Sequence, residues 1–216
     1  IISPKVKKIV CIDASLDAIN IAKENLKKYV NVEYKVASVD KTNLEKSSFD
    51  FGYSLGVLHH LPDTVSALKS CSRLLKADAP FLLYLYYAFD NKPKWYKWVW
   101  KISELVRQFV NRMPPNLKFF LSNIIAIFVY YPFSRLAKLL YIFNFNVDNF
   151  PLSYYHDKSF YTMQTDSRDR FGTPLEKRFS KKEIEKMMKE ACFKDIKFSE
   201  SKPYWVVVGF KDNSAS

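Results

Sequence analysis

Residues 49–63 read FDFGYSLGVLHHLPD, and this stretch decides the fold. Its apolar first half, from Phe49 to Leu55, is typical of a short buried strand, and Asp63 is placed to cap a following helix. Gly56 comes directly after the expected strand, where the lack of a Cβ lets the backbone approach a ligand closely. The stretch predicts a strand, a loop at the carboxyl end of that strand, and a helix.

The same alternation of strand and helix extends on both sides of this stretch. Apolar runs predict strands at residues 8–13, 31–37 and 81–87, helical spacing predicts helices at residues 15–29, 63–75 and 180–192, and two last strands are expected at 195–199 and 204–210. Strands and helices that alternate at this spacing predict an α/β fold with a Rossmann-like, doubly wound and mostly parallel sheet.

The alternation is interrupted by an insertion. Residues 93–112 and 115–146 have the spacing of amphipathic helices, broken at Pro114-Pro115 and bent at Pro132, and residues 154–178 are expected to form a polar loop. We therefore expect an α/β core made of residues 1–90 and 179–216. Residues 91–178 are expected to form a helical and loop region that acts as a lid or substrate region.

Composition excludes several classes of protein. Only 4 of 216 residues are glycine, and none falls in the spacing of a phosphate-binding loop, which excludes a P-loop NTPase. The 48% hydrophobic content is enough for a sizeable core. Three widely spaced cysteines in apolar contexts, Cys11, Cys71 and Cys192, predict core thiols in a reducing, cytoplasmic compartment.

Asp13 and the pair His59-His60 are the first candidates for chemistry. Asp13 ends an expected strand, where a carboxylate can bind the ribose hydroxyls of an adenosine-containing cofactor. The alternative is an acid placed at a helix start by the helix dipole. The two histidines lie at the carboxyl edge of the sheet and could equally be ordinary loop residues. The residues alone leave both alternatives open.

As a set, these motifs resemble the class I S-adenosylmethionine-dependent methyltransferases, most closely the type 11 group, which includes enzymes of ubiquinone and menaquinone biosynthesis. The motifs are Asp13-Ala14-Ser15, Phe49-Asp50, GVLHHLPD at 56–63, Leu74-Leu75-Lys76 and Glu190-Ala191-Cys192-Phe193. The resemblance covers about residues 8–87 and resumes at 180–210.

The resemblance implies a binding site for S-adenosylmethionine. It implies that Asp13 binds the ribose hydroxyls, with Ala14 and Ser15 beside it, and that Leu55 and Gly56 line the methionine part. Ser38-Val39 lies where the family often has Asp-Ala against the adenine, so a serine replaces the usual acid.

The family's first strand and its Gly-rich turn would lie upstream of Ile1. In the family that strand is the centre of the sheet, between the strand of Asp13 and the strand at 51–55. We therefore expect a sheet that lacks its first strand, in the C-terminal part of a longer methyltransferase. We also expect this chain to bind S-adenosylmethionine poorly by itself.

His59 and His60 are the candidates for a general base, if the acceptor needs one. No cysteine or further histidine is spaced to complete a metal site with them. In the polar segment, Tyr155, His156, Arg168 and Arg170 are candidates for substrate binding, because arginine binds carboxylate or phosphate groups with two hydrogen bonds. The alternative for this segment is a salt-bridged connection.

The positive charge is concentrated in the insertion. The net charge is +12, and residues 92–147 contain nine basic residues and one acid, Glu104. KWYKWVWK at 94–101 and the uncharged residues 119–133 fit an interfacial helix on anionic lipid, since 15 residues are too few to span a bilayer. The alternative is a lid packed on the sheet. Nucleic-acid binding is not expected, because the aromatics lie in continuous apolar runs.

The sequence thus predicts a methyltransferase that acts on a small-molecule or lipid-like acceptor. The alternative is a non-catalytic, membrane-associated or interaction module built on a degenerate methyltransferase scaffold. We expect a cytoplasmic location, with peripheral contact at the inner face of the membrane if the basic segment binds lipid.

Overall fold

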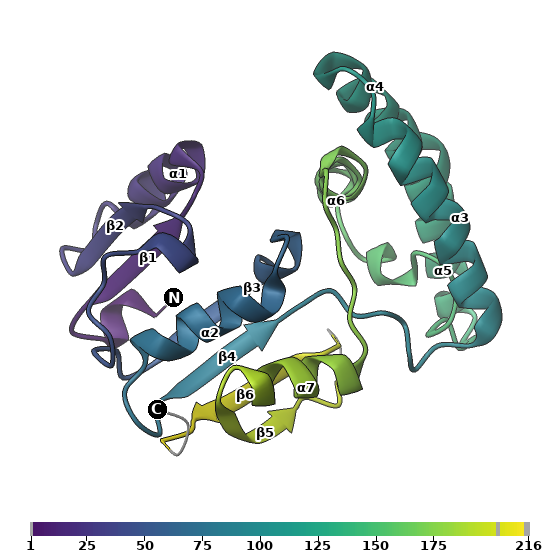
Figure 1. Ribbon diagram of the computed structural model, residues 1–216. Helices are drawn as coiled ribbons and strands as arrows, with labels where there is room; N and C mark the ends of the chain where they lie inside the picture. The colour runs from purple at the N-terminus through teal and green to yellow at the C-terminus, as the bar shows by residue number, and fades with distance from the viewer. Residues whose placement is uncertain (1, 202–203, 214–216) are drawn as a thin grey trace. The chain divides into compact units, whose positions relative to one another are not determined.

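The computed structural model describes residues 2–201 and 204–213 (Figure 1). The chain divides into two compact units. Unit 1 comprises residues 1–86 and 181–216, and unit 2 comprises residues 87–180. Each unit has its own buried residues, so each is described by itself.

Unit 1 contains the expected strands and helices, with bounds that differ from the predicted ones by a few residues. Its strands are β1 (Ile9–Asp13), β2 (Val32–Val36), β3 (Gly52–Leu55), β4 (Pro80–Tyr84), β5 (Phe193–Phe198) and β6 (Val206–Lys211). Its helices are α1 (Leu16–Leu26), α2 (Thr64–Leu74) and α7 (Lys181–Glu190), with short 3₁₀ turns η1 (Ser3–Lys5), η2 (Val39–Lys41) and η3 (Leu58–His60).

Side-chain caps begin the first two helices. The Ser15 hydroxyl accepts a hydrogen bond from the Ala18 N–H at 3.3 Å, and the Asp63 carboxylate accepts one from the Ser66 N–H at 2.9 Å. Each bond satisfies an N–H group that the helix itself cannot pair. Both caps were expected from the sequence, and both are confirmed.

The strands form two sheets. β1 and β2 pair in parallel in one sheet, and the other has the strand order β3-β4-β6-β5. In the four-stranded sheet β3, β4 and β5 run in one direction and β6 runs against them. β1 and β3 belong to different sheets, so the two strands that the family places on either side of its first strand do not pair directly with each other.

Helices α2 and α7 lie against the four-stranded sheet (Figure 1). Leu68 of α2 and Met188 of α7 are fully buried. A Cβ at Gly209 of β6 would stand 2.8 Å from the Met188 Cε and 3.2 Å from the Phe193 Cβ, so glycine allows α7 to pack closely on this strand. The core of unit 1 is this layer of side chains between helices and sheet.

Unit 2 is helical. It contains α3 (Lys94–Asn111), α4 (Pro115–Ile125), a π-helical turn η4 (Ala126–Tyr130), α5 (Tyr131–Ile142), the 3₁₀ turn η5 (Ser153–Tyr155) and α6 (Phe160–Gly172). Its buried cluster consists of Val110, Tyr130, Met163 and Phe171. Pro132 lies two residues after the π-helical turn, inside the continuous helix from Pro115 to Ile142, where it lacks the N–H of a helical hydrogen bond.

Helix α6 corrects the sequence prediction, which placed a polar loop at residues 154–178. Ser159 caps this helix by accepting a hydrogen bond from the Thr162 N–H at 3.2 Å. Met163, Ser167 and Phe171 form its buried face, at a spacing of four residues. Because that face has only two apolar residues among many charges, the sequence carries little helical periodicity.

The packing of unit 1 generates a stability prediction. Leu83 in β4 is fully buried between β3 and β6, so Leu83→Ala is expected to lower the free energy of unfolding by about 3 kcal/mol. Ile21 in α1 is 62% exposed, and Ile21→Ala should change it by less than about 0.5 kcal/mol. Urea unfolding of the two variants tests this, and equal effects would contradict the assigned core.

Candidate functional site

The carboxyl ends of β1 and β2 bring the first group of predicted residues together. Asp13 ends β1 opposite Val36 of β2, and the Ala37 N–H donates to the Asp13 carbonyl at 2.9 Å. Ser38 follows directly at the start of η2. Parallel pairing therefore places Asp13 and Ser38 at the same edge of the sheet, which is the edge where α/β folds bind ligands.

The Asp13 carboxylate has one oxygen fixed by the chain. Its Oδ1 accepts a hydrogen bond from the Ser15 N–H at 2.8 Å, while the Ser15 hydroxyl caps α1. Asp13 is half-buried, and Ala14 and Ser15 are exposed. The helix-entry role left open by the sequence is therefore present. It orients the carboxylate and leaves its second oxygen, Oδ2, as an acceptor for a ligand hydroxyl.

Asp40 is an acid at this edge that sequence reasoning missed. The Ser38 hydroxyl donates a hydrogen bond to the Asp40 carboxylate, and this bond lowers the pKa of Asp40. A carboxylate thus stands two residues after the position where the family often has its acid. The sequence signal for this acid is the spacing in Ser38-Val39-Asp40, which places Asp40 only two residues after Ser38. Val39 begins η2.

The second group lies at the carboxyl end of β3. Leu55 ends the strand with its side chain half exposed, and Gly56 follows with a φ of +72°. The Gly56 N–H donates to the Tyr84 carbonyl of β4 at 2.9 Å. A Cβ at Gly56 would meet only the Tyr84 Cδ1, at 3.9 Å, so backbone conformation and not crowding makes glycine suitable here.

The two histidines differ in exposure. His59 is fully buried, and its ring stacks on Tyr86 with centroids 3.9 Å apart. His60 is half-buried, with its ring centroid 4.0 Å from that of His59. Because a general base must reach its substrate, burial disfavours His59 and leaves His60 as the better candidate.

The predicted cofactor residues therefore form two groups on two sheets of unit 1. Asp13, Ala14, Ser15, Ser38 and Val39 lie at the ends of β1 and β2, whereas Leu55 and Gly56 lie at the end of β3. The four predicted substrate residues, Tyr155, His156, Arg168 and Arg170, belong to unit 2.

Arg170 is the centre of a largely buried ion network in unit 2. Its Nη1 lies 2.6 Å from Glu176 Oε1, and its Nη2 lies 3.6 Å from Glu104 Oε2. Arg178 and Arg107 complete the network, with contacts of 2.8 Å to Glu176 and 2.6 Å to Glu104. Burial lowers the pKa of Arg170, and the charge of Glu176 acts against this. The network favours the salt-bridged connection as the role of Arg170.

The other three predicted substrate residues also have contacts within unit 2. The Arg168 Nε donates to the Asn123 Oδ1 at 3.0 Å, and its guanidinium lies 4.1 Å from the centroid of the Phe119 ring. Tyr155 packs on Tyr130 with centroids 5.2 Å apart, and the His156 Nδ1 lies 2.7 Å from the Ser153 carbonyl. Substrate binding by these residues stays a prediction.

No metal cluster is seen in the part of the chain that the structure describes. Within residues 2–201 and 204–213, no three His, Cys, Asp or Glu side chains gather as metal ligands. The three cysteines are half-buried thiols, where the sequence predicted core positions. Burial raises the pKa of Cys71 to about 12, so this thiol is protonated and unreactive near neutral pH.

The N-terminal part of the chain is similar to known methyltransferases. Residues 2–83 match the sequence profile described as a methyltransferase domain. A ubiquinone biosynthesis O-methyltransferase of Xanthomonas oryzae pv. oryzae is 31% identical over 78 residues, covering 35% of this chain and 33% of that protein. The matched segment thus spans about a third of the relative's length.

Solved structures of methyltransferases have a similar fold. A S-adenosylmethionine-dependent methyltransferase from Methanosarcina mazei superposes with a TM-score of 0.54 at 14% identity, covering 98% of this chain and 85% of that one. The CurJ carbon methyltransferase gives a TM-score of 0.51 at 12% identity, covering 95% and 42%. The α/β fold expected from the sequence is confirmed.

The turn after β3 generates a prediction about Gly56. Gly56→Ala is expected to lower the free energy of unfolding by about 1 kcal/mol, because a side chain at positive φ is strained. Gly56→Asn should lose less, since asparagine tolerates this conformation. Urea unfolding compares the two variants. An alanine variant as stable as the wild type would contradict the left-handed turn.

The ion network generates a prediction about Arg170. Arg170→Ala is expected to lower the free energy of unfolding by about 3 kcal/mol, because it removes a partner from the buried Glu176. Arg112, at the end of α3, is exposed, so Arg112→Ala should change stability by less than about 0.5 kcal/mol. Thermal and urea unfolding measure both. If the two variants were equally stable, Arg170 would be available for substrate binding.

Proposed function

We propose that this chain is a class I S-adenosylmethionine-dependent methyltransferase that transfers a methyl group to a small-molecule acceptor. The observation that carries the proposal is the position of Asp13 and Gly56 at the carboxyl ends of parallel strands. This is the ligand-binding edge of α/β folds.

The residues at this edge fit the cofactor of the family. The Asp13 carboxylate is oriented by the Ser15 N–H and has a second oxygen that can accept a hydrogen bond from a ribose hydroxyl. Asp40 adds a carboxylate at the same edge, and Gly56 keeps the end of β3 free of a side chain. S-adenosylmethionine supplies a methyl group on a positively charged sulfur. The protein's part is then to bind and align the two reactants.

The acceptor that we propose is a lipid-like molecule with a hydroxyl group. The name of the relative, a ubiquinone biosynthesis O-methyltransferase, supports an oxygen acceptor, and the apolar side chains of unit 2 support an apolar one. A hydroxyl must lose its proton as the methyl group is transferred, and an imidazole can take it near neutral pH. We assign this role to the half-buried His60.

A second candidate function is a non-catalytic module that binds a membrane or a partner. The exposed apolar side chains of α3 and α5 favour this second candidate, because they can contact a membrane or a partner protein without a bound cofactor. Binding of S-adenosylmethionine and methyl transfer separate the two candidates.

The geometry predicts weak cofactor binding by these 216 residues alone. The cofactor residues lie on two sheets that share no strand pairing, so binding must also hold the two groups in place. We expect isothermal titration with S-adenosylmethionine to give a dissociation constant weaker than micromolar. Micromolar or tighter binding would show that the two groups are already arranged for the cofactor.

Methyl transfer tests the role of Asp13. Labelled S-adenosylmethionine is supplied with phenolic quinone precursors, sugars and lipids as acceptors. Asp13→Asn is expected to raise the KM for S-adenosylmethionine about tenfold or more, because it removes a charged hydrogen-bond acceptor. Asp17→Asn, an exposed acid in the first turn of α1, is the control and should leave this KM unchanged. Protein that neither binds the cofactor nor transfers methyl groups would favour the second candidate.

A further inference from the structure

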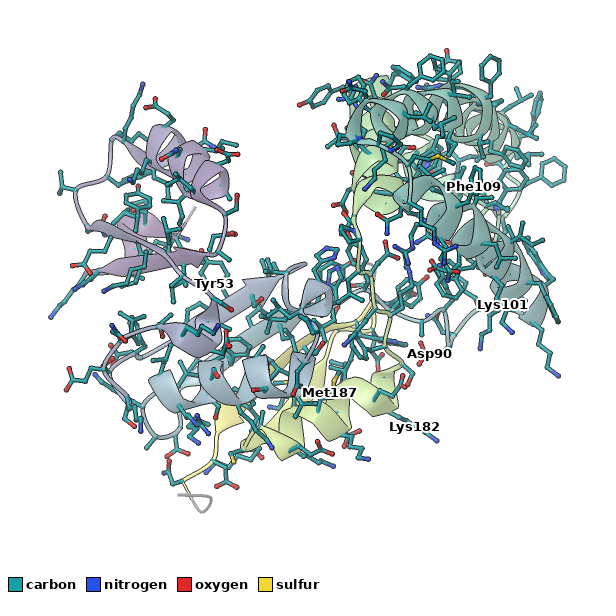
Figure 2. All side chains as sticks on the ribbon, turned by 45° about the horizontal axis from the view of Figure 1, so that its top comes forward. Tyr53, Asp90, Lys101, Phe109, Lys182 and Met187 are labelled. Carbon is teal, nitrogen blue, oxygen red and sulfur yellow. The ribbon has the colours of Figure 1, made fainter. Side chains whose placement is uncertain are left out.

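Helix α3 has an exposed apolar face. Trp98, Ile102, Leu105 and Phe109 are each between 62% and 67% exposed, and their spacing of four, three and four residues places them on one side of the helix. The opposite side is covered within unit 2, where Arg107 and Val110 are buried. Lys101 and Phe109 are labelled on this helix in Figure 2. We refer to these four residues as the α3 apolar face.

Residues 115–146 also expose large apolar side chains. The most exposed of them are Phe120, Phe128, Ile142, Phe143 and Phe145, each between 60% and 71% exposed. Exposed apolar patches of this extent are unusual on soluble monomers and mark interaction or membrane surfaces.

The start of α3 is cationic. Lys94, Lys97 and Lys101 surround Trp98 in a shallow hollow of about 190 Å³, and the Lys101 Nζ lies 4.9 Å from the centroid of the Trp98 ring. Glu104 follows on the same helix, but it pairs with Arg107 at 2.6 Å inside unit 2. These three lysines, called the lysine cluster below, therefore lie beside the α3 apolar face. The Glu104 carboxylate does not neutralise them, because it is paired with Arg107.

We propose that unit 2 docks on the surface of an anionic lipid bilayer. The lysine cluster would bind headgroup phosphates, Trp98 would lie at headgroup level, and the α3 apolar face would enter the boundary of the acyl chains. The positive charge of residues 92–147 favours an anionic membrane, and not a second copy of the chain, as the partner of this surface. With a net charge of +8 over residues 92–147, a second copy of the chain would be repelled, whereas an anionic surface attracts it.

The helix from Pro115 to Ile142 lies on the membrane in this proposal and does not cross it. By length and composition it is apolar enough to span a bilayer. It is tied to α6, however, by a buried hydrogen bond of 2.8 Å from the Ser167 hydroxyl to the Ser122 carbonyl. Helix α6 carries Asp166, Arg168, Asp169 and Arg170, which a spanning arrangement would draw into hydrocarbon at high cost.

Vesicle flotation of the full chain without cofactor tests the charge part of the proposal. We expect binding to phosphatidylcholine vesicles with about 25% phosphatidylglycerol, weaker binding to phosphatidylcholine alone, and release at high salt. Replacing Lys94, Lys97 and Lys101 by glutamine should weaken binding on the order of 100-fold. The matched control replaces three exposed lysines of unit 1, Lys23, Lys27 and Lys28, and should bind like the wild type.

A second pair of variants tests the apolar part. Ile102→Ser should weaken vesicle binding about tenfold, because it removes an apolar side chain from the buried contact. Ile21→Ser is the control, since Ile21 is a helical isoleucine of unit 1 with the same 62% exposure. Equal unfolding midpoints of the two variants show that neither result reflects misfolding. Equal binding by the two variants would overturn the role of the α3 apolar face.

Three further outcomes would overturn the proposal. One is a monomer that binds no vesicle, in which case the apolar face covers another part of the same chain. Another is a dimer in sedimentation that Ile102→Ser dissociates, without vesicle binding. The third is protein that resists extraction from vesicles by an alkaline wash, because that result would indicate a spanning helix. Because no cofactor is present, failure here leaves the proposed methyl transfer untouched.

Discussion

The parallel pairing of β3 with β4 is the constraint on which the second half of the candidate site depends. The register places Leu55 beside Tyr84, and the hydrogen bond from the Gly56 N–H to the Tyr84 carbonyl continues it past the strand end. At Gly56 the chain then turns through a left-handed conformation into η3 and α2. The position of His60 follows from this pairing, because few residues separate it from the strand.

The elements of unit 1 could be predicted from the sequence because each has a local signal. Apolar runs marked β1, β3 and β4, and Ser15 and Asp63 marked the starts of helices. Helix α6 has a capping serine, Ser159, but no apolar periodicity, since Ser167 occupies the middle of its buried face. Only the hydrogen bond from Ser167 to Ser122, in a helix far away in the sequence, makes that serine a core residue. Such packing cannot be deduced from local periodicity.

The positions of the candidate site residues could also be predicted from the sequence, but the environment of their side chains could not. Its residues at strand ends follow from the fold, because parallel strands end at a common edge. The burial of these side chains and their hydrogen-bond or ion-pair partners do not follow from the fold. The sequence treated His59 and His60 alike, yet His59 stacks beneath Tyr86 and is closed to solvent. The sequence also left the role of Arg170 open, because its partners Glu104 and Glu176 come from separate segments.

The same ion network changes the meaning of the positive charge in the insertion. Arg107 counts toward the net charge of residues 92–147, but it is paired with Glu104 inside unit 2. Arg170, which lies outside this segment, is paired with Glu176. Arg107 is buried on α3, and Trp98, Ile102, Leu105 and Phe109 of the same helix are exposed. The charge that remains at the surface is mainly lysine, on the same helix as those apolar residues. Arg107 is paired inside unit 2, whereas Lys94, Lys97 and Lys101 line a surface hollow beside the α3 apolar face, and this side-chain distribution supports the proposed contact with lipid.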